Sequence, residues 1–140
     1  MKKFTFILLA LATLAISLNF KMMANPFLGK WQLKSKIVQK LENGKLQEGF
    51  EKNYKPNKKI YEFMGEDKLI VIEDDGKTKE KKKYVVEGNS IYIGKEKTEK
   101  NQYIFTFNKD NTVTLDQKRI KTKEGITFED IEILTFEKIQ

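Results

Sequence analysis

The sequence predicts an all-β fold, and three observations indicate it. Residues 25–140 contain no alanine, the best helix former, and are rich in β-branched and aromatic residues that suit a pleated sheet. Turn-forming pairs interrupt the chain at short intervals, and apolar residues alternate with polar ones between them. Short strands separated in this way are typical of an antiparallel sandwich or barrel.

Residues 1–24 are typical of a secretory signal peptide. Lys2 and Lys3 precede seventeen uncharged residues, and Ala24 supplies a small residue before the expected cleavage point. An uncleaved membrane anchor is the alternative, but the uncharged stretch falls short of the roughly 20 apolar residues that span a bilayer. We therefore expect an exported protein, periplasmic or secreted, in which residues 25–140 form one domain without a membrane span.

Six turn signals divide this domain into strands. They are Asn43-Gly44, Gly65-Glu66-Asp67, Asp75-Gly76, Gly88-Asn89, Asp110-Asn111 and Glu124-Gly125. The first is a strong two-residue hairpin signal and would pair Leu41 with Leu46. The fourth would pair Val86 with Ile91. Because apolar residues then face apolar residues, the turns predict a meander with one continuous inner face.

The strand that precedes the first turn gives the start of this face. Trp31, Leu33, Ile37 and Leu41 share one parity in the sequence, which predicts that all four point inward and that Val38 points outward. After the turn, the less regular segment 46–59 predicts the end of a strand followed by a loop over one barrel mouth.

Two later segments, 57–71 and 101–115, resemble each other. In one, Phe63 precedes Leu69 by six residues, and in the other Phe107 precedes Val113 by six. This spacing predicts two similar hairpins, each closed by one left-handed residue and a bulge, a position that Asp67 or Asn111 can tolerate. An ancient duplication would explain the similarity, but two ordinary hairpins of a meander explain it as well and are favoured.

The predicted inner face is aliphatic and aromatic. Its members are Tyr61, Phe63, Leu69, Val71, Tyr84, Val86, Ile91, Ile93, Tyr103, Phe105, Phe107, Val113 and Leu115. Apolar walls with a few tyrosine hydroxyls can orient an amphipathic ligand such as a fatty acid. The alternative, equally favoured, is that a small barrel fills its interior with its own side chains.

Arg119 is the only arginine, and it shares the parity of the inner-facing residues that precede it. Near a barrel rim, its planar guanidinium would suit a ligand carboxylate. An exposed rim residue within a lysine-rich surface is the favoured alternative.

The composition excludes several function classes. Without cysteine there is no disulfide framework or thiol nucleophile, and without histidine as well there is no zinc site of the usual kind and no Ser-His-Asp triad. No carboxylate pair stands out as catalytic, so we expect no enzyme, no metal and no cofactor. The domain has a net charge of only +4, with acids interspersed among its lysines, which predicts a charge-mixed surface and no nucleic-acid partner.

Gly29-Lys30-Trp31 looks like the Gly-x-Trp motif of the lipocalin superfamily. With the 63–69 hairpin and the final Leu134–Lys138 pattern, residues 25–140 resemble small bacterial lipocalin-like domains. The resemblance implies an up-and-down antiparallel β-barrel of about eight strands around a pocket for a small apolar ligand. It also implies that Gly29 and Trp31 form a structural plug at the closed end. A cation would cover Trp31, for which Lys138 matches and Arg119 is a second candidate.

The resulting expectation is an exported, non-catalytic binding protein for a small, largely apolar or amphipathic ligand. Seven residues are expected to bind it: Tyr61, Phe63, Tyr84, Tyr103, Phe105, Phe107 and Arg119. The alternative is an envelope protein–protein interaction module with a filled barrel. Its contact surface would include four residues predicted to point outward, namely Val38, Ile70, Ile72 and Tyr92.

Overall fold

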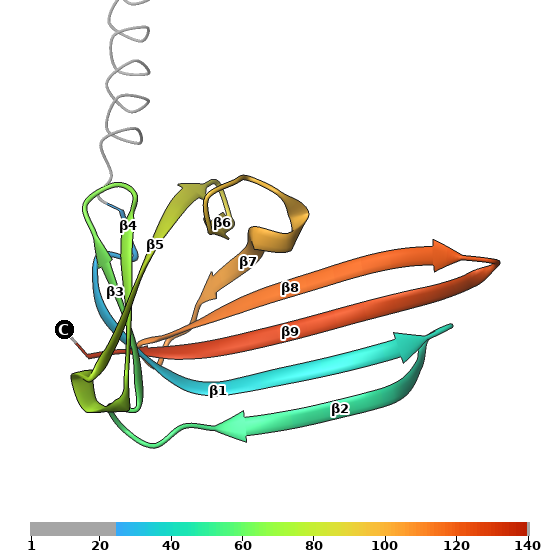
Figure 1. Ribbon diagram of the computed structural model, residues 1–140, viewed down its shortest axis with the longest axis horizontal. Helices are drawn as coiled ribbons and strands as arrows, with labels where there is room; N and C mark the ends of the chain where they lie inside the picture. The colour runs from blue at the N-terminus through green and yellow to red at the C-terminus, as the bar shows by residue number, and fades with distance from the viewer. Residues whose placement is uncertain (1–24, 140) are drawn as a thin grey trace, which may run out of the picture.

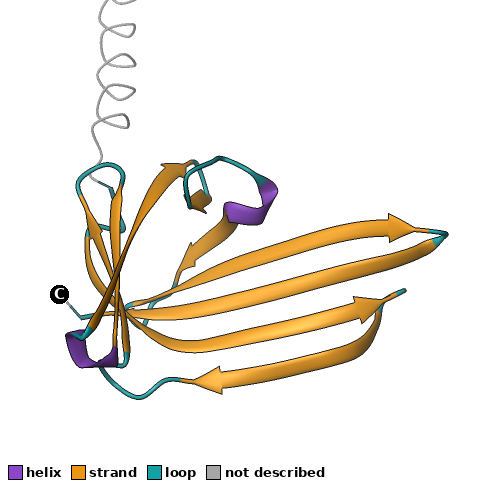
Figure 2. Ribbon diagram, in the orientation of Figure 1, coloured by secondary structure: helices purple, strands orange, loops and turns teal. Residues whose placement is uncertain are grey.

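The computed structural model describes residues 25–139, which form nine strands and two short 3-10 helices (Figure 1). In chain order these are β1 (Gly29–Glu42), β2 (Lys45–Asn53), β3 (Lys59–Met64), β4 (Lys68–Glu73), η1 (Asp74–Gly76), β5 (Thr78–Glu87), β6 (Ser90–Ile93), η2 (Glu99–Asn101), β7 (Gln102–Phe107), β8 (Thr112–Lys123) and β9 (Ile126–Lys138). Strand dominates the described chain (Figure 2). The predicted leader, residues 1–24, lies outside the described residues.

Eight strands close an antiparallel barrel. From β3 to β9 each strand pairs with the next in sequence, and β1 closes the ring by pairing with β3 on one edge and β9 on the other. β2 lies outside this ring and pairs only with β1. The predicted all-β, up-and-down barrel of about eight strands is therefore confirmed.

The predicted turns separate consecutive strands as expected. Leu41 lies opposite Leu46, and Val86 lies opposite Ile91. At Asn43-Gly44 the φ angles are +49° and +79°, the left-handed pair that a tight hairpin turn requires. Both repeated hairpins form, with Phe63 opposite Leu69 and Phe107 opposite Val113. In the second turn the left-handed residue is Asn111, as predicted, but in the first it is Gly65 and not Asp67, because glycine adopts this conformation without a Cβ clash.

Three barrel strands continue beyond the barrel and, together with β2, form a sheet that we call the extension. It comprises residues 35–42 of β1, 45–53 of β2, 117–123 of β8 and 126–133 of β9. Figure 1 shows it projecting to one side of the barrel. Within residues 46–59 the expected strand end and loop are both present, but the loop is limited to residues 54–58 because β2 continues to Asn53. All nine residues of this edge strand are exposed. Since neither of its faces is buried, its sequence lacks the alternation of apolar and polar residues by which a strand is recognised.

A β-bulge in β1 lies where the barrel passes into the extension. Opposite β9, Leu33 faces Phe136 while Ser35 faces Thr135, so Lys34 is an extra residue. One extra residue exchanges the two faces of every position that follows it.

The bulge overturns the predicted faces of the second half of β1. Lys36 lies opposite the buried Leu134, so it and Val38 continue the inner face. Ile37 and Leu41 therefore lie on the outer face. The prediction that these two residues point inward and that Val38 points outward is wrong.

The barrel core matches the predicted inner face closely. Twelve of the thirteen predicted residues are buried in the core or packed against it. The exception, Phe107, is 42% exposed, although its ring centroid lies 5.3 Å from that of Phe27. Phe27 itself is a core residue that the sequence prediction omitted, because it precedes the first strand. Within residues 25–139, no helix has the length and apolar character to cross a membrane.

Candidate functional site

One end of the barrel is closed by the segment that precedes β1. Phe27 is 1% exposed, and its ring centroid lies 4.9 Å from that of Phe105 and 5.3 Å from that of Phe63. The Trp31 Nε1–H donates a hydrogen bond of 2.8 Å to the Phe27 carbonyl oxygen. The segment is thus held both by aromatic packing and by a buried hydrogen bond.

Trp31 lies at this closed end, 3% exposed. The Lys138 Nζ lies 5.5 Å from its ring centroid, so the covering cation comes from the last strand. Gly29 opens β1 with a φ of +114°, a conformation that L side chains rarely adopt. Arg119 lies six residues beyond Val113 along β8, which is roughly 20 Å at strand spacing, and so belongs to the other end of the barrel. Of the two predicted cations, Lys138 is therefore the one that covers Trp31.

Three of the predicted ligand-binding residues, Phe63, Tyr84 and Phe105, fill the barrel interior towards the closed end, which we call the lower barrel. The Phe63 and Tyr84 rings meet edge to face at 4.9 Å. The buried Tyr84 hydroxyl accepts a hydrogen bond from Asn25 Nδ2 (2.6 Å) and donates one to the Gly65 carbonyl oxygen (2.9 Å). Burial raises the pKa of Tyr84, so the hydroxyl stays protonated. With its polar group already bonded, Tyr84 acts here as a core residue.

The opposite end of the barrel, which we call the mouth, is polar. Its residues come from five strands: Lys36 of β1, Tyr61 of β3, Tyr103 of β7, Arg119 of β8 and Glu132 of β9. The Tyr103 hydroxyl donates to Glu132 Oε1 at 3.3 Å, and the Lys36 Nζ lies 3.8 Å from the same oxygen. Barrel closure thus brings together side chains that are up to 96 positions apart in the sequence.

The two tyrosines at the mouth are held in the neutral form. Burial is the main cause that raises the pKa of Tyr103, and the negative charge of Glu132 raises it further, while Arg119 opposes the shift. Burial also raises the pKa of Tyr61, against the nearby positive charge of Lys59. Both hydroxyls are therefore hydrogen-bond donors across the physiological pH range.

Arg119 contains the one buried side-chain nitrogen or oxygen of the described residues that lacks a hydrogen-bond partner, its Nε. Asp130 lies directly opposite on β9, yet no carboxylate oxygen of the described chain lies within 4 Å of the guanidinium. A buried donor without an acceptor costs about 1–3 kcal/mol. Such an atom is unusual in a native protein and calls for an acceptor that the chain itself does not supply.

An apolar strip continues from the mouth along the inner face of the extension. Val38 lies directly opposite both Glu132 and Phe50, and Phe128 lies two positions beyond Asp130 on the same face. Phe50 is 56% exposed and Phe128 is 40% exposed. The strip therefore offers aromatic surface to solvent beside the polar cluster.

Parity placed Tyr61, Tyr103 and Arg119 on the inner side, and the structure brings these three to the mouth. The favoured alternative, an exposed Arg119, does not hold for its Nε, which is buried. Glu132 and Lys36 were missed. Glu132 shares the parity of Leu134 and could have been found from it, but the bulge hides the inward direction of Lys36. In residues 25–139, no three acidic side chains are grouped so that they could hold a metal ion.

Comparison with protein-family models, with curated proteins and with solved structures found no match to this chain. The lipocalin-like resemblance therefore stays a prediction.

Proposed function

We propose that the protein is an exported, non-catalytic binding protein that holds an amphipathic ligand with a carboxylate head. The head would lie at the mouth and the apolar body along the strip formed by Val38, Phe50 and Phe128. The single observation that carries this proposal is the buried, unpartnered Nε of Arg119. A carboxylate beside it would supply the missing acceptor and could also accept from a second guanidinium N–H.

The charges around Arg119 support an anionic head. The Glu132 carboxylate at the mouth already interacts with Lys36 and with the Tyr103 hydroxyl, and Asp130, directly opposite Arg119, has no carboxylate oxygen within 4 Å of the guanidinium. The guanidinium therefore forms no ion pair within residues 25–139, although Asp130 lies across from it on β9. A ligand carboxylate at this position would be attracted by Arg119 and would meet a neutral Tyr61 hydroxyl rather than a tyrosinate.

The packing of the lower barrel supports a site at the mouth rather than deep inside. Phe27 contacts both Phe63 and Phe105 there, and the Tyr84 hydroxyl already has two partners. In this proposal Phe63, Tyr84, Phe105 and Phe107 form the rigid base on which the mouth is built.

The test compares two probes of equal chain length, dodecanoate and dodecanol, binding to the protein by calorimetry. A charge-assisted hydrogen bond to the carboxylate is worth about 1.5–3 kcal/mol, so Arg119→Gln should weaken dodecanoate binding at least about ten-fold. The same substitution should leave dodecanol binding within about two-fold. Lys123→Gln is the matched control, since it removes one positive charge from the same strand at the tip of the extension.

Equal losses for both probes in Arg119→Gln would show that Arg119 does not read the head group. Failure of both probes to bind the wild-type protein would reject the amphipathic ligand itself. Unchanged dodecanoate binding in the variant would reject the assignment of the head to Arg119.

A protein partner is the second candidate, and the outer face of the extension favours it. Six aliphatic residues gather there: Ile37, Leu41, Leu46, Ile120, Ile131 and Ile133. A hollow of about 580 Å³ is lined by Ile104, Ile120, Ile131 and Ile133 together with polar residues. Contiguous apolar surface of this kind often marks a protein interface.

This candidate predicts that Ile120→Asp combined with Ile131→Asp abolishes capture of a partner from envelope extracts. Met64→Asp, at an exposed apolar residue of β3 outside the extension, serves as the control and should leave capture unchanged. Equal capture by all three proteins would count against the extension as the interface.

A further inference from the structure

Four lysines gather on the outer face of β4 and β5, although lysines and acids alternate closely along the sequence. Lys68 lies directly opposite Lys83, while Lys81 and Lys79 lie opposite Ile70 and Ile72. These positions alternate with the core residues Leu69 and Val71, so all four lysines point away from the core. With Lys95, which follows β6, they form what we call the lysine cluster.

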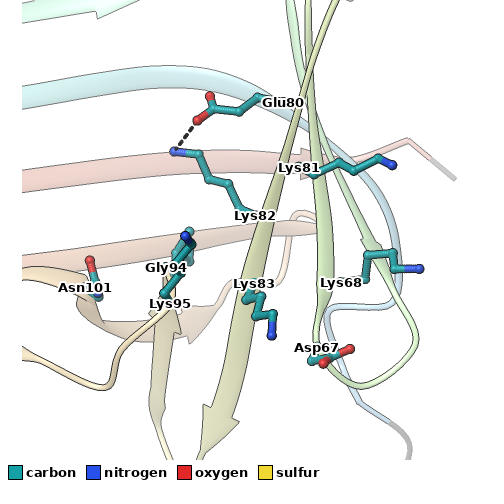
Figure 3. Close-up of a pocket in the computed structure, with 10 residues that line it drawn as sticks. Asp67, Lys68, Glu80, Lys81, Lys82, Lys83, Gly94, Lys95 and Asn101 are labelled. Atoms are coloured by element: carbon teal, nitrogen blue, oxygen red, sulfur yellow. Dashed lines mark ion pairs between the residues drawn. The ribbon is translucent and has the colours of Figure 1, made fainter.

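The cluster is not neutralised by the described part of the chain. No carboxylate oxygen between residues 25 and 139 lies within 4 Å of an Nζ of these five lysines. The neighbouring Lys82 does have a partner, Glu80, at 3.7 Å. Figure 3 shows this pair on one side of β5, with Lys81 and Lys68 directed to the other.

The pairing of Lys68 with Lys83 opposes the stability of the free protein. Side chains directly opposite each other in an antiparallel pair have Cβ atoms about 4.5–5.5 Å apart, and like charges at such positions repel. A bound anion would turn this repulsion into attraction for both lysines. The arrangement is therefore one that an anionic ligand would stabilise.

A hollow of about 540 Å³ lies beside the cluster. Its lining comprises Asp67, Lys68, Glu80, Lys81, Lys82, Lys83, Ile93, Gly94, Lys95 and Asn101. Five lysines against two acids give this lining a net charge of +3. The volume is within the range of about 300–1,000 Å³ that small-molecule sites occupy.

The wall of the hollow around Gly94 is fixed in place. The Gly94 N–H donates a hydrogen bond of 2.8 Å to the Lys83 carbonyl oxygen. A Cβ at Gly94 would lie 2.8 Å from the side chain of Asn101, so a residue with a Cβ would not fit here unless Asn101 moved. The Asn101 Nδ2 in turn donates to the Glu96 carbonyl oxygen at 2.8 Å. These contacts fasten the segment after β6 to β5.

We propose that this hollow binds a phosphate-bearing molecule, at a site separate from the mouth. Lysine ammonium groups are compact point charges with three donors each, which suit the dispersed oxygens of phosphate. A phosphate group carries nearly two negative charges, which matches the excess of positive charge on the lining. The phosphate would belong either to a soluble phosphorylated molecule or to the headgroup of a membrane lipid.

Two arms of one experiment distinguish these sources. In the first, the amide NMR signals of the protein are followed during titration with sodium pyrophosphate. In the second, the protein is sedimented with vesicles of phosphatidylglycerol and phosphatidylcholine, and with vesicles of phosphatidylcholine alone. In the first arm we expect the amide signals of Lys68, Lys83 and Gly94 to shift with pyrophosphate. In the second arm we expect the protein to sediment only with vesicles that contain phosphatidylglycerol. Either result supports the site.

The variant Lys68→Gln/Lys83→Gln should weaken the observed binding at least ten-fold. Lys45→Gln/Lys123→Gln removes the same charge from the two edge strands of the extension, at residues without an ion pair, and should change binding less than two-fold. The cluster variant should also unfold at a higher temperature than the wild type without any probe, because the repulsion is gone.

Binding of pyrophosphate supports a soluble ligand, and binding of phosphatidylglycerol vesicles alone supports a lipid headgroup. If the protein binds neither pyrophosphate nor phosphatidylglycerol vesicles, the proposal is overturned. Equal weakening in the two double variants would overturn it as well, since net charge alone would then explain the binding. A cluster variant that unfolds below the wild type would contradict the repulsion on which the inference rests.

Discussion

Replacement of Phe27 by alanine tests whether this side chain fills the closed end of the barrel. Phe27 is 1% exposed and contacts the rings of Phe63, Phe105 and Phe107 at centroid distances of 4.9–5.3 Å. Burial of a phenylalanine contributes about 1.5–3 kcal/mol, and the cavity left by its removal adds to the loss. We therefore expect Phe27→Ala to lower the free energy of unfolding by about 4 kcal/mol.

A loss of this size is a large share of the roughly 5–15 kcal/mol that stabilises a typical domain. It corresponds to a fall of roughly 15 °C in the midpoint of thermal unfolding. The assay is urea unfolding followed by the fluorescence of Trp31, the only tryptophan, whose Nε1–H is bonded to the Phe27 carbonyl oxygen. The dependence on urea should keep its slope, since the unfolded chain exposes nearly the same surface.

Phe128→Ala is the matched control, because it makes the same substitution at a side chain that is 40% exposed on the extension. Its loss should stay below about 1 kcal/mol. If Phe27→Ala cost no more than Phe128→Ala, the closed end would not depend on Phe27, and the reasoning that the chain fills its own barrel would be refuted.

Three further predictions concern a turn, a bulge and the buried tyrosines. Glu124 adopts a φ of +52° in the turn between β8 and β9, so Glu124→Asn should raise the free energy of unfolding by about 0.5–1 kcal/mol, and a decrease in urea unfolding would contradict this. Deletion of Lys34 removes the bulge but leaves Leu33 opposite Phe136 and Ser35 opposite Thr135, so the faces of β1 should be kept and the unfolding free energy should fall by only about 0.5–1.5 kcal/mol, for the lost hydrogen bond from the Tyr54 N–H to the Lys34 carbonyl oxygen; a much larger loss would show that the bulge itself is needed where β1 changes neighbours. Burial raises the pKa of Tyr61, Tyr84 and Tyr103 above the ordinary 10.0. Their contribution to stability is complete below about pH 10 and is lost as the pH rises beyond it, because the unfolded chain releases these protons first. Urea midpoints between about pH 9 and 11 should fall less steeply in Tyr103→Phe than in the wild type, and equal slopes would argue against the shift at Tyr103.

Features that depend on a few neighbouring residues could be predicted from the sequence. Asn43-Gly44 specifies its own turn, and the turn sets Leu41 opposite Leu46. The alternation around Phe63 and Phe107 likewise identifies two hairpins and most of the core. Here local propensity and the tertiary fold agree.

Features that depend on three strands at once could not be predicted from the sequence. Lys34 bulges because β1 exchanges neighbours, from β3 to β2 on one edge while β9 continues on the other. The outward turn of Ile37 and the inward turn of Lys36 follow from that exchange. Phe27 gave no signal either, since it enters the core from a segment without strand periodicity.

The candidate sites show the same division. Parity along single strands was enough to place Tyr103 and Arg119 on the inner side, but the approach of Tyr103 on β7 to Glu132 on β9 depends on the arrangement of three strands. The lysine cluster was hidden for a related reason. Alternating charges look balanced along the sequence, yet the register of β4 with β5 sets Lys68 directly against Lys83.

The central claim is that the barrel interior is filled by the chain and that ligand binds at the mouth. The most direct measurement is a map of NMR shifts in the aromatic and guanidinium signals during titration with dodecanoate. We expect shifts at Arg119 Nε, Tyr103, Phe50 and Phe128, with the Trp31 Nε1 signal unmoved. Shifts centred on Trp31, Phe27 and Phe63, with Arg119 unaffected, would place the ligand inside the barrel and contradict the account.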